Sequence, residues 1–409
     1  MLSISVPFTL ITLLLLAPCI IAKADKPSVL LLYTGGTIGM KKIDGSYQPS
    51  AGYLQHLMEL NPQFSDPKLP SYTVLEYTPL LDSSNMNQTH WITIAKDIDQ
   101  HYKAYDGFVV IHGTDTLSYT SSALSFLLNY LRKPVIITGS QVPMCEPYSD
   151  GTQNLLGSII AAGSINIGEV LVFFNNQLMR GNRVQKKDSF TFEAFGSGAF
   201  NNIGIFGGEL SLFNSDPLPS PLFFRSLSVE NSMSTDIYMV MIYPGISADF
   251  IRNLVSNGAR GIVFLSYGMG NIPDENKELL TAISEANQNE VILIDSSQCF
   301  SGIVDLNHYS TGNSMLKAGC ISSKDMTPEA AFSKLSYLIG QGWSNEKIKK
   351  LIGVNMRGEL DGDLIVDYLG YGYLLGSVFV FVFVVFILKR FFSIAIKRFR
   401  LRNYNKIND

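Results

Sequence analysis

The sequence predicts an α/β protein of two domains, followed by one membrane-spanning helix. Short apolar runs alternate with amphipathic helical segments through residues 26–367, the pattern of a parallel sheet covered by helices. At 409 residues the chain exceeds the usual ~100 to 200 residues of one domain. Residues 368–388 are uncharged and long enough to cross a bilayer. We therefore expect a larger N-terminal domain with a mainly parallel sheet and a smaller C-terminal α/β domain.

The first apolar run, residues 4–21, has the features of a secretion signal. It is followed by Ala22-Lys23-Ala24, a small-x-small cleavage site. We predict a signal peptide over residues 1–24 and a mature chain that begins near Asp25. The segment before the run contains no Lys or Arg, which leaves an uncleaved anchor as the alternative.

The second apolar run, residues 368–388, would form about 32 Å of helix at ~1.5 Å per residue. The tail at residues 389–409 holds seven Lys and Arg against one Asp, which places it in the cytoplasm by the positive-inside rule. A lipid anchor is disfavoured because its signal would end in the hydrophobic stretch. The sequence thus predicts a single-pass type I membrane protein whose body is extracellular or luminal.

Charge and cysteine content exclude several classes. Subtracting the tail (+6) and the leader (+1) from the net charge of −4 leaves −11 for residues 25–388, so a nucleic-acid partner is not expected. Four cysteines without C-x-x-C spacing argue against a disulfide scaffold and a zinc module.

The predicted N-terminal domain spans residues 25–213. Its strands are continuous apolar runs, as strands buried on both faces require. We expect strands at 29–33, around 74–77, and at 108–112, 135–139 and 170–174, with helices at 119–130 and 155–162. Pro217, Pro219 and Pro221 interrupt any regular pattern, so residues 214–232 are predicted as an interdomain linker.

The predicted C-terminal domain, residues 233–367, repeats the alternation. Strands are expected at 236–243, 261–267 and 291–295, and helices at 248–256, 274–287, 328–339 and 345–352. Thr327-Pro328 has the pattern of an N-cap followed by proline at the first helical position.

Active sites of parallel sheets form at the carboxyl ends of strands. The first strand is followed by Thr34-Gly35-Gly36-Thr37-Ile38-Gly39. The glycines permit a sharp turn, and the two threonine hydroxyl groups are candidate nucleophiles or hydrogen-bond partners. A plain glycine turn or a phosphate cradle is the alternative, although the P-loop and dinucleotide patterns are absent.

Three further polar clusters are candidates for the site. His112-Gly113-Thr114-Asp115-Thr116 places a hydroxyl beside a carboxylate, although Asp115 or Thr116 could simply cap the next helix. Asp82-Ser83-Ser84 follows the strand around 74–77, and Lys186-Lys187 would ordinarily be a solvated charge pair. The G-x-S-x-G, H-E-x-x-H and clustered His/Cys patterns are absent.

Together these residues resemble the bacterial-type L-asparaginase family, most closely its type I, cytosolic-like branch. The resemblance covers nearly all of residues 28–360. Two signature motifs carry it, residues 34–39 and the stretch Gly-Phe-Val-Val-Ile-His-Gly-Thr-Asp-Thr-Leu at 107–117. Supporting similarity lies at residues 76–84, 138–143, 173–176, 180–183, 243–249 and 266–271.

The resemblance implies hydrolysis of L-asparagine to L-aspartate and ammonia without metal or organic cofactor. Thr37 would attack the amide and form an acyl-enzyme ester. Tyr47, on a lid at residues 39–49, would share removal of the Thr37 proton. Thr114, Asp115 and Lys186 would form a second group, in which Lys186 polarises Thr114 or its bound water and Asp115 holds the substrate ammonium.

Binding residues follow from the same resemblance. Asp82, Ser83 and Ser84 match the loop that binds the substrate carboxylate and amine, chiefly through Ser83. Family members are usually tetramers built from close dimers, so we expect a homo-oligomer, a dimer or tetramer. Asn271 matches the residue that a neighbouring C-terminal domain contributes to the site. The glutamate that type II members receive from their partner has no evident counterpart.

Some family features are not expected here. Gln185 and Leu265 replace the threonine and arginine of the allosteric asparagine site that type I members can carry, so that site should not be retained. The signal peptide and membrane span are also foreign to the cytosolic branch.

The choice between the two adjacent lysines also comes from the resemblance. Arg183 anchors the alignment with the family, and this alignment selects Lys186 rather than Lys187.

Two alternative functions stay open. The first is another amidohydrolase of this fold, such as a glutaminase-asparaginase or an amidotransferase subunit acting on glutaminyl-tRNA precursors, although the acidic body opposes a tRNA partner. The second is a catalytically inactive membrane-tethered binding protein, although Thr37, Thr114, Asp115 and Lys186 are all present.

The sequence also contains Asn87-Gln88-Thr89, which is either a glycosylation sequon or the N-cap of a helix.

Overall fold

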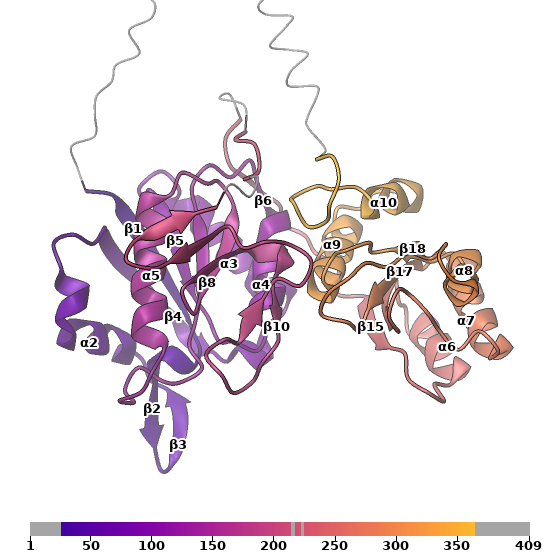
Figure 1. Ribbon diagram of the computed structural model, residues 1–409, viewed down its shortest axis with the longest axis horizontal. Helices are drawn as coiled ribbons and strands as arrows, with labels where there is room; N and C mark the ends of the chain where they lie inside the picture. The colour runs from indigo at the N-terminus through magenta and orange to yellow at the C-terminus, as the bar shows by residue number, and fades with distance from the viewer. Residues whose placement is uncertain (1–25, 214–216, 222–224, 365–409) are drawn as a thin grey trace, which may run out of the picture.

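The computed structural model describes residues 26–213, 217–221 and 225–364, and Figure 1 shows two sheets, each with its own helices. The predicted signal peptide at 1–24, membrane span at 368–388 and basic tail at 389–409 lie outside these ranges. Within the described ranges, none of the helices has the length and hydrophobicity that a bilayer crossing needs.

The larger sheet has eight strands, and the five at one end of it, including the edge strand β4, are parallel. β4, β1, β5, β7 and β8 run parallel to one another, and β9, β12 and β13 extend the sheet by antiparallel pairing. The prediction of a mainly parallel sheet is therefore confirmed. The strands are β1 (Ser28–Gly35), β4 (Ser71–Leu81), β5 (Gly107–Ile111), β7 (Val135–Thr138), β8 (Val170–Phe174), β9 (Gln177–Arg180), β12 (Gly204–Phe206) and β13 (Leu210–Leu212).

The strand order in this sheet reverses beside β1. The chain passes from β1 to the edge strand β4 and then crosses to β5 on the other side of β1. Loops that leave adjacent strands at such a switch point diverge and leave room for a ligand. The turns after β1 and β5 carry the two signature motifs, so the topology brings both motifs to one place.

Helices cover both faces of the larger sheet. α3 (Gln88–His101) and α4 (Leu117–Leu127) pack on one face, and α2 (Tyr53–Leu60) and α5 (Gly151–Ser164) pack on the other. Alternate β1 residues enter the two cores, with Leu30 and Leu32 on the α4 side and Val29 and Leu31 on the α5 side. This burial on both faces explains why the strands read as continuous apolar runs.

The smaller sheet is parallel, in the order β15-β16-β17-β18. Its strands are β15 (Ile237–Met241), β16 (Gly261–Ser266), β17 (Ile292–Ser297) and β18 (Ile321–Ser322). One face packs against α6 (Ala248–Ser256), α7 (Lys277–Gln288) and α8 (Ser310–Lys317). On the other face lie α9 (Pro328–Gly340) and α10 (Asn345–Ile352). α9 packs against α4 of the larger domain, so the two domains share one core.

Most predicted elements are present, with shifted ends. α4 ends at Leu127 rather than 130 because β6 (Leu128–Asn129) pairs with β14 (Ser228–Val229), a short strand inside the predicted linker. Thr327 caps α9 by accepting a hydrogen bond from Ala330 N, with Pro328 at the first helical position as predicted. Asn87 caps α3, and its amide oxygen accepts from Thr89 N and His90 N.

The remaining described elements are a hairpin, a short two-stranded pair and several 3-10 turns. β2 (Met40–Ile43) and β3 (Ser46–Pro49) form a hairpin that projects from the lower edge in Figure 1, opposite the first and last described residues. β10 (Gln185–Lys186) pairs with β11 (Phe195–Gly196). The short 3-10 turns are η1 (Thr37–Gly39), η2 (Pro62–Ser65), η3 (Ser83–Asn85) and η4 (Gly181–Arg183).

Candidate active site

Three turns meet in direct contact at the end of the larger sheet. A Cβ atom on Gly36 would lie 2.5 Å from Gly113 N, and one on Gly113 would lie 2.4 Å from the Ser83 Oγ. Gly36 also has a φ of 94°, which side chains rarely adopt. The glycines therefore allow the turns after β1, β4 and β5 to pack together, and the structure joins three motifs that the sequence places far apart.

The two threonines of the first motif differ sharply in environment. Thr34 is buried, and its hydroxyl group donates to the Ile111 carbonyl at 2.9 Å, which ties β1 to β5. Thr37 begins η1, is half-buried, and makes no side-chain hydrogen bond within the described residues. Of the two candidate nucleophiles, Thr37 thus has its hydroxyl group available, whereas the Thr34 hydroxyl is structural.

Lys186 lies at the second motif, as its register predicts. Its ammonium group donates to the Thr114 hydroxyl oxygen at 2.9 Å and to the Asp115 carboxylate at 2.8 Å. Lys187 instead pairs with Glu193 at 2.5 Å on the surface. The structure therefore brings Thr114, Asp115 and Lys186 together and leaves Lys187 outside the site.

The alternative that Asp115 or Thr116 caps α4 is not what the structure shows. Thr116 occupies the N-cap position but makes no capping bond, and its hydroxyl group donates to the Ser83 carbonyl at 2.7 Å. Asp115 binds Lys186. Ser83 is buried with its hydroxyl group against Gly113, whereas Asp82 and Ser84 are exposed and Asp82 caps η3.

A buried histidine, His112, holds the turn of the second motif in place through hydrogen bonds. The His112 Nδ1 atom lies 2.7 Å from the Gly113 carbonyl, and Nε2 lies 2.9 Å from the Thr120 hydroxyl, which accepts from Trp91 Nε1. Burial lowers the pKa of His112 to about 4, so the ring is neutral at physiological pH. A carbonyl can only accept, so Nδ1 carries the proton and Thr120 donates to Nε2. His112 is therefore a structural support for the Gly113–Thr114 turn.

Buried ion pairs fix the segment that carries Lys186. Arg183 is fully buried and donates to the Gly358 carbonyl at 2.7 Å, to Asp325 at 2.6 Å and to Asp361 at 2.9 Å. These partners belong to the C-terminal part of the chain, so the smaller domain helps to position Lys186, three residues further on. A hollow beside this segment is lined by Arg183, Gln185, Ser297, Cys299, Lys324 and Thr327, among others.

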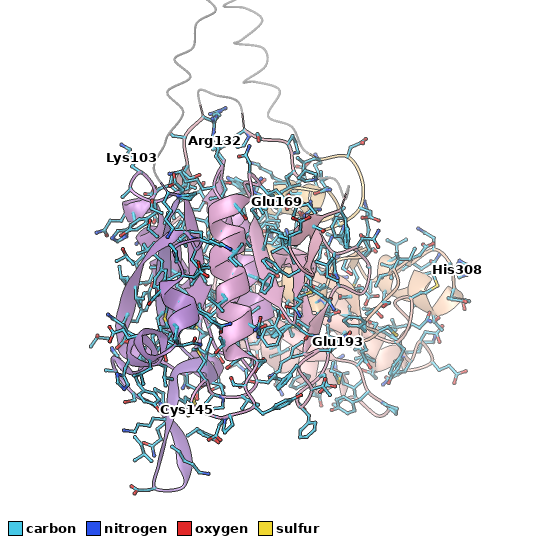
Figure 2. All side chains as sticks on the ribbon, turned by 60° about the vertical axis from the view of Figure 1, so that its left-hand side comes forward. Lys103, Arg132, Cys145, Glu169, Glu193 and His308 are labelled. Atoms are coloured by element: carbon cyan, nitrogen blue, oxygen red, sulfur yellow. The ribbon has the colours of Figure 1, made fainter. Side chains whose placement is uncertain are left out.

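Tyr47 lies on the hairpin, where the structure supplies a partner that the sequence did not reveal. Its hydroxyl group donates to Glu146 Oε1 at 2.8 Å, and this contact raises the pKa of the Tyr47 phenol. The neighbouring Cys145 lies beside the base of the hairpin (Figure 2), where its thiol group approaches the Met40 carbonyl. The Tyr47 proton is thus directed to Glu146, and the predicted role of Tyr47 towards Thr37 stays a prediction.

Gln141 is a second residue that the sequence analysis missed. It follows β7, and its side chain links Thr114 to the loop at residues 188–191. Its backbone N–H donates to Asp150, a mostly buried carboxylate that also accepts from Val142 N and Asn154 Nδ2. The supporting similarity at residues 138–143 was the signal that could have identified it.

Asn271 lies apart from this group. It ends the turn after β16 in the smaller domain, and its amide oxygen accepts from the Thr311 hydroxyl at 2.6 Å. Its contacts among the described residues are with that domain. The predicted role of Asn271 in a neighbouring copy's site stays a prediction.

Comparisons with known proteins agree with this geometry. A family model described as "Asparaginase, N-terminal" matches residues 28–218, and one described as "Glutaminase/Asparaginase C-terminal domain" matches residues 236–352. L-asparaginase 1 of Escherichia coli (strain K12) is 44% identical over 339 residues, which cover 83% of this chain and 99% of that protein. The 60 kDa lysophospholipase of Mus musculus is 39% identical over 360 residues, covering 83% and 63%.

Solved structures give the same result. The crystal structure of L-asparaginase I from Vibrio cholerae O1 biovar eltor matches with a TM-score of 0.77 and 41% identity, and the match covers 83% of this chain and 100% of that one. The two family models match in order and together cover most of the chain. The chain therefore belongs to the asparaginase family.

Proposed function

We propose that this protein is an L-asparaginase, which hydrolyses the side-chain amide of L-asparagine to L-aspartate and ammonia. One observation carries the proposal. Two hydroxyl groups lie at adjacent strand ends, one of them without a side-chain partner in the described chain (Thr37) and the other held by Lys186 at 2.9 Å (Thr114). The names of the E. coli and V. cholerae relatives support the same reaction.

In the proposed first step, the Thr37 oxygen attacks the amide carbon of the substrate. The carbon–nitrogen bond breaks, the departing nitrogen takes up the proton that Thr37 has lost and leaves as ammonia, and an aspartyl ester remains on Thr37. Tyr47 and Glu146 provide the route for the Thr37 proton. Because the phenol already donates to Glu146, its oxygen can accept from Thr37 while its own proton passes to the carboxylate. Water then opens the ester, which releases L-aspartate and restores Thr37.

The remaining residues bind the substrate and stabilise charge. Asp115, exposed at the site and paired with Lys186, is the proposed partner of the substrate ammonium. Ser83, with Asp82 and Ser84 beside it, is the proposed partner of the substrate carboxylate and amine. Lys186 polarises Thr114, or water bound there, during hydrolysis of the ester.

We also propose that two or four copies assemble. Asn271 lies on the smaller domain, where its amide oxygen accepts from Thr311, and its proposed role is in the site of another copy. A dimer or tetramer in solution, measured by light scattering, is the expected result, and a monomer with full activity would contradict this arrangement.

The predicted signal peptide and membrane span lead to a proposal on location. We infer a type I single-pass protein whose catalytic body faces the outside of the cell or a lumen. The first and last described residues lie on the side opposite the hairpin, so attachment there would leave the site facing away from the bilayer (Figure 1). Protease added to sealed cells should leave only a short tail fragment protected. Protection of the whole body would contradict this topology.

The test of the activity is ammonia release by the full-length protein in detergent. L-asparagine should be hydrolysed, and L-glutamine should be tested beside it because one methylene group is typically worth only ~1 to 3 kcal/mol in such a pocket. A lysophospholipid should be included because one relative carries that name. Folded protein that releases no ammonia from either amino acid would exclude the proposal and favour an inactive binding protein.

A further inference from the structure

Gln141 connects the second catalytic group to a surface loop. Its Oε1 atom lies 3.3 Å from the Thr114 hydroxyl oxygen, and its Nε2 atom lies 3.2 Å from the Thr191 carbonyl and 3.4 Å from the Asp188 carbonyl. Its backbone N–H is held by Asp150. Both ends of the amide group and the main chain of Gln141 are therefore held by hydrogen bonds.

The contacts leave one orientation for the amide group. The Thr191 and Asp188 carbonyl oxygens can only accept hydrogen bonds, so the NH₂ end must face them. A flipped amide would set its oxygen against two carbonyl oxygens. The oxygen of Gln141 therefore faces Thr114, and it can only accept.

The same reasoning fixes the direction of the Thr114 proton. A lysine ammonium has three donors and no acceptor, so Thr114 accepts from Lys186 and must give its own proton elsewhere. Gln141 Oε1 is the acceptor within reach. We propose that Gln141 is a positioning residue of the hydrolytic site, which turns the Thr114 proton away from the substrate and leaves an oxygen lone pair free to accept from water.

This inference rests on the proposed function and adds a residue to it. The Thr114 oxygen has two lone pairs, of which Lys186 uses one. With the proton held by Gln141, the second lone pair can accept a hydrogen bond from the water that opens the ester. The separation of 3.3 Å is long for a hydroxyl donor, as is common for catalytic contacts before the substrate binds.

The test compares two substitutions in the full-length protein. Gln141→Met preserves the length of the side chain but removes both the acceptor and the donors. Gln141→Glu restores the acceptor for Thr114 but sets a carboxylate against the two loop carbonyls. If Gln141 orients Thr114, Gln141→Met should lower kcat by at least ~10-fold with KM within ~3-fold, and Gln141→Glu should recover part of that loss.

A purely structural anchor would give the opposite order, because Gln141→Glu would then be the more damaging change. Gln177→Met is the matched control: Gln177 is half-buried on β9 and binds Asn202, away from the site, so its kcat should not change. If Gln141→Glu fails to fold, Gln141→Met can be combined with Thr114→Val. The double variant should be no slower than Thr114→Val alone, because Gln141 then has no hydroxyl group to orient.

Three results would overturn the inference. They are a kcat for Gln141→Met within twofold of the wild type, a folded Gln141→Glu slower than Gln141→Met, and losses that multiply in the double variant. Wild-type protein that releases no ammonia would instead remove the proposed function, so the two failures can be told apart.

Discussion

The Thr116 hydroxyl donates a hydrogen bond to the Ser83 carbonyl at 2.7 Å, which ties the turn after β5 to the loop after β4. This bond fixes the proposed substrate-binding loop against the proposed catalytic turn. Thr116→Val removes the donor and should raise KM several-fold with a smaller change in kcat, since such a bond contributes about 1 kcal/mol. Thr116→Ser keeps the hydroxyl group and should behave like the wild type. Equal KM values for the two variants would contradict this role.

The two adjacent lysines allow a matched test of the site. Lys186→Met removes the donor to Thr114 and Asp115 and should lower turnover by a factor of at least ~1000, as should Thr37→Ala. Lys187→Met breaks only the surface pair with Glu193 and should leave ammonia release near the wild-type value. Circular dichroism should show all three variants folded. Substantial turnover by folded Thr37→Ala would remove the proposed mechanism.

The contact between Tyr47 and Glu146 makes the proton route testable. Glu146→Gln still accepts a hydrogen bond from Tyr47 but cannot take its proton, so kcat should fall by ~10 to 100-fold. Tyr47→Phe should have a similar effect, and combining the two changes should add little. Glu193→Gln is the control, because it neutralises another surface carboxylate that pairs with Lys187. A Glu146→Gln enzyme as fast as this control would exclude the relay.

A buried carboxyl group in the smaller domain predicts the pH dependence of stability. Asp295 lies on β17, fully buried beside Ser266 and Cys320, and burial raises its pKa to about 7 from 3.8. Below pH 3.8 the group is neutral in both the folded and unfolded states. As the pH rises from 3.8 to about 7, the unfolded chain ionises while the folded one does not, so the free energy of unfolding falls, by about 4 kcal/mol.

Asp295→Asn removes this titration. The variant should be more stable than the wild type at pH 7.5, and the difference should shrink towards pH 4. Urea unfolding of both proteins at the two pH values measures it. A stability difference that does not depend on pH would show that Asp295 is not the group responsible.

The sequence was a good guide where local pattern decides the structure. The strands of both sheets are continuous apolar runs because both of their faces are buried. In β1 and β5, for example, almost every residue is buried. The signature motifs follow these strands directly, so the meeting of Thr37 with the Thr114 turn follows from the parallel topology. The end of α4 was misplaced because β14, about 100 residues later, pairs with its last residues.

Contacts between distant loops were beyond such reasoning. Glu146 lies 99 residues from Tyr47, and Gln141 lies 27 residues from Thr114. Neither spacing has a periodicity that would reveal the pair. From residue types alone Thr34 and Thr37 were equivalent candidates, and it was the family resemblance that selected Thr37. The physical reason for that choice is the Ile111 carbonyl on a different strand, which engages the Thr34 hydroxyl group.

The hydrogen-bonded series from Trp91 through Thr120 to His112 gives the protein an internal spectroscopic probe. Trp91 is one of two tryptophans in the chain, and it is buried with its indole N–H engaged in this series. The other, Trp343, lies under the Lys347 ammonium at 3.6 Å on the smaller domain. In a Trp343→Phe background, the fluorescence of Trp91 would therefore report whether the turn that carries Thr114 is in place. Ligand binding and local unfolding of the site could then be followed by Trp91 fluorescence, without any added label.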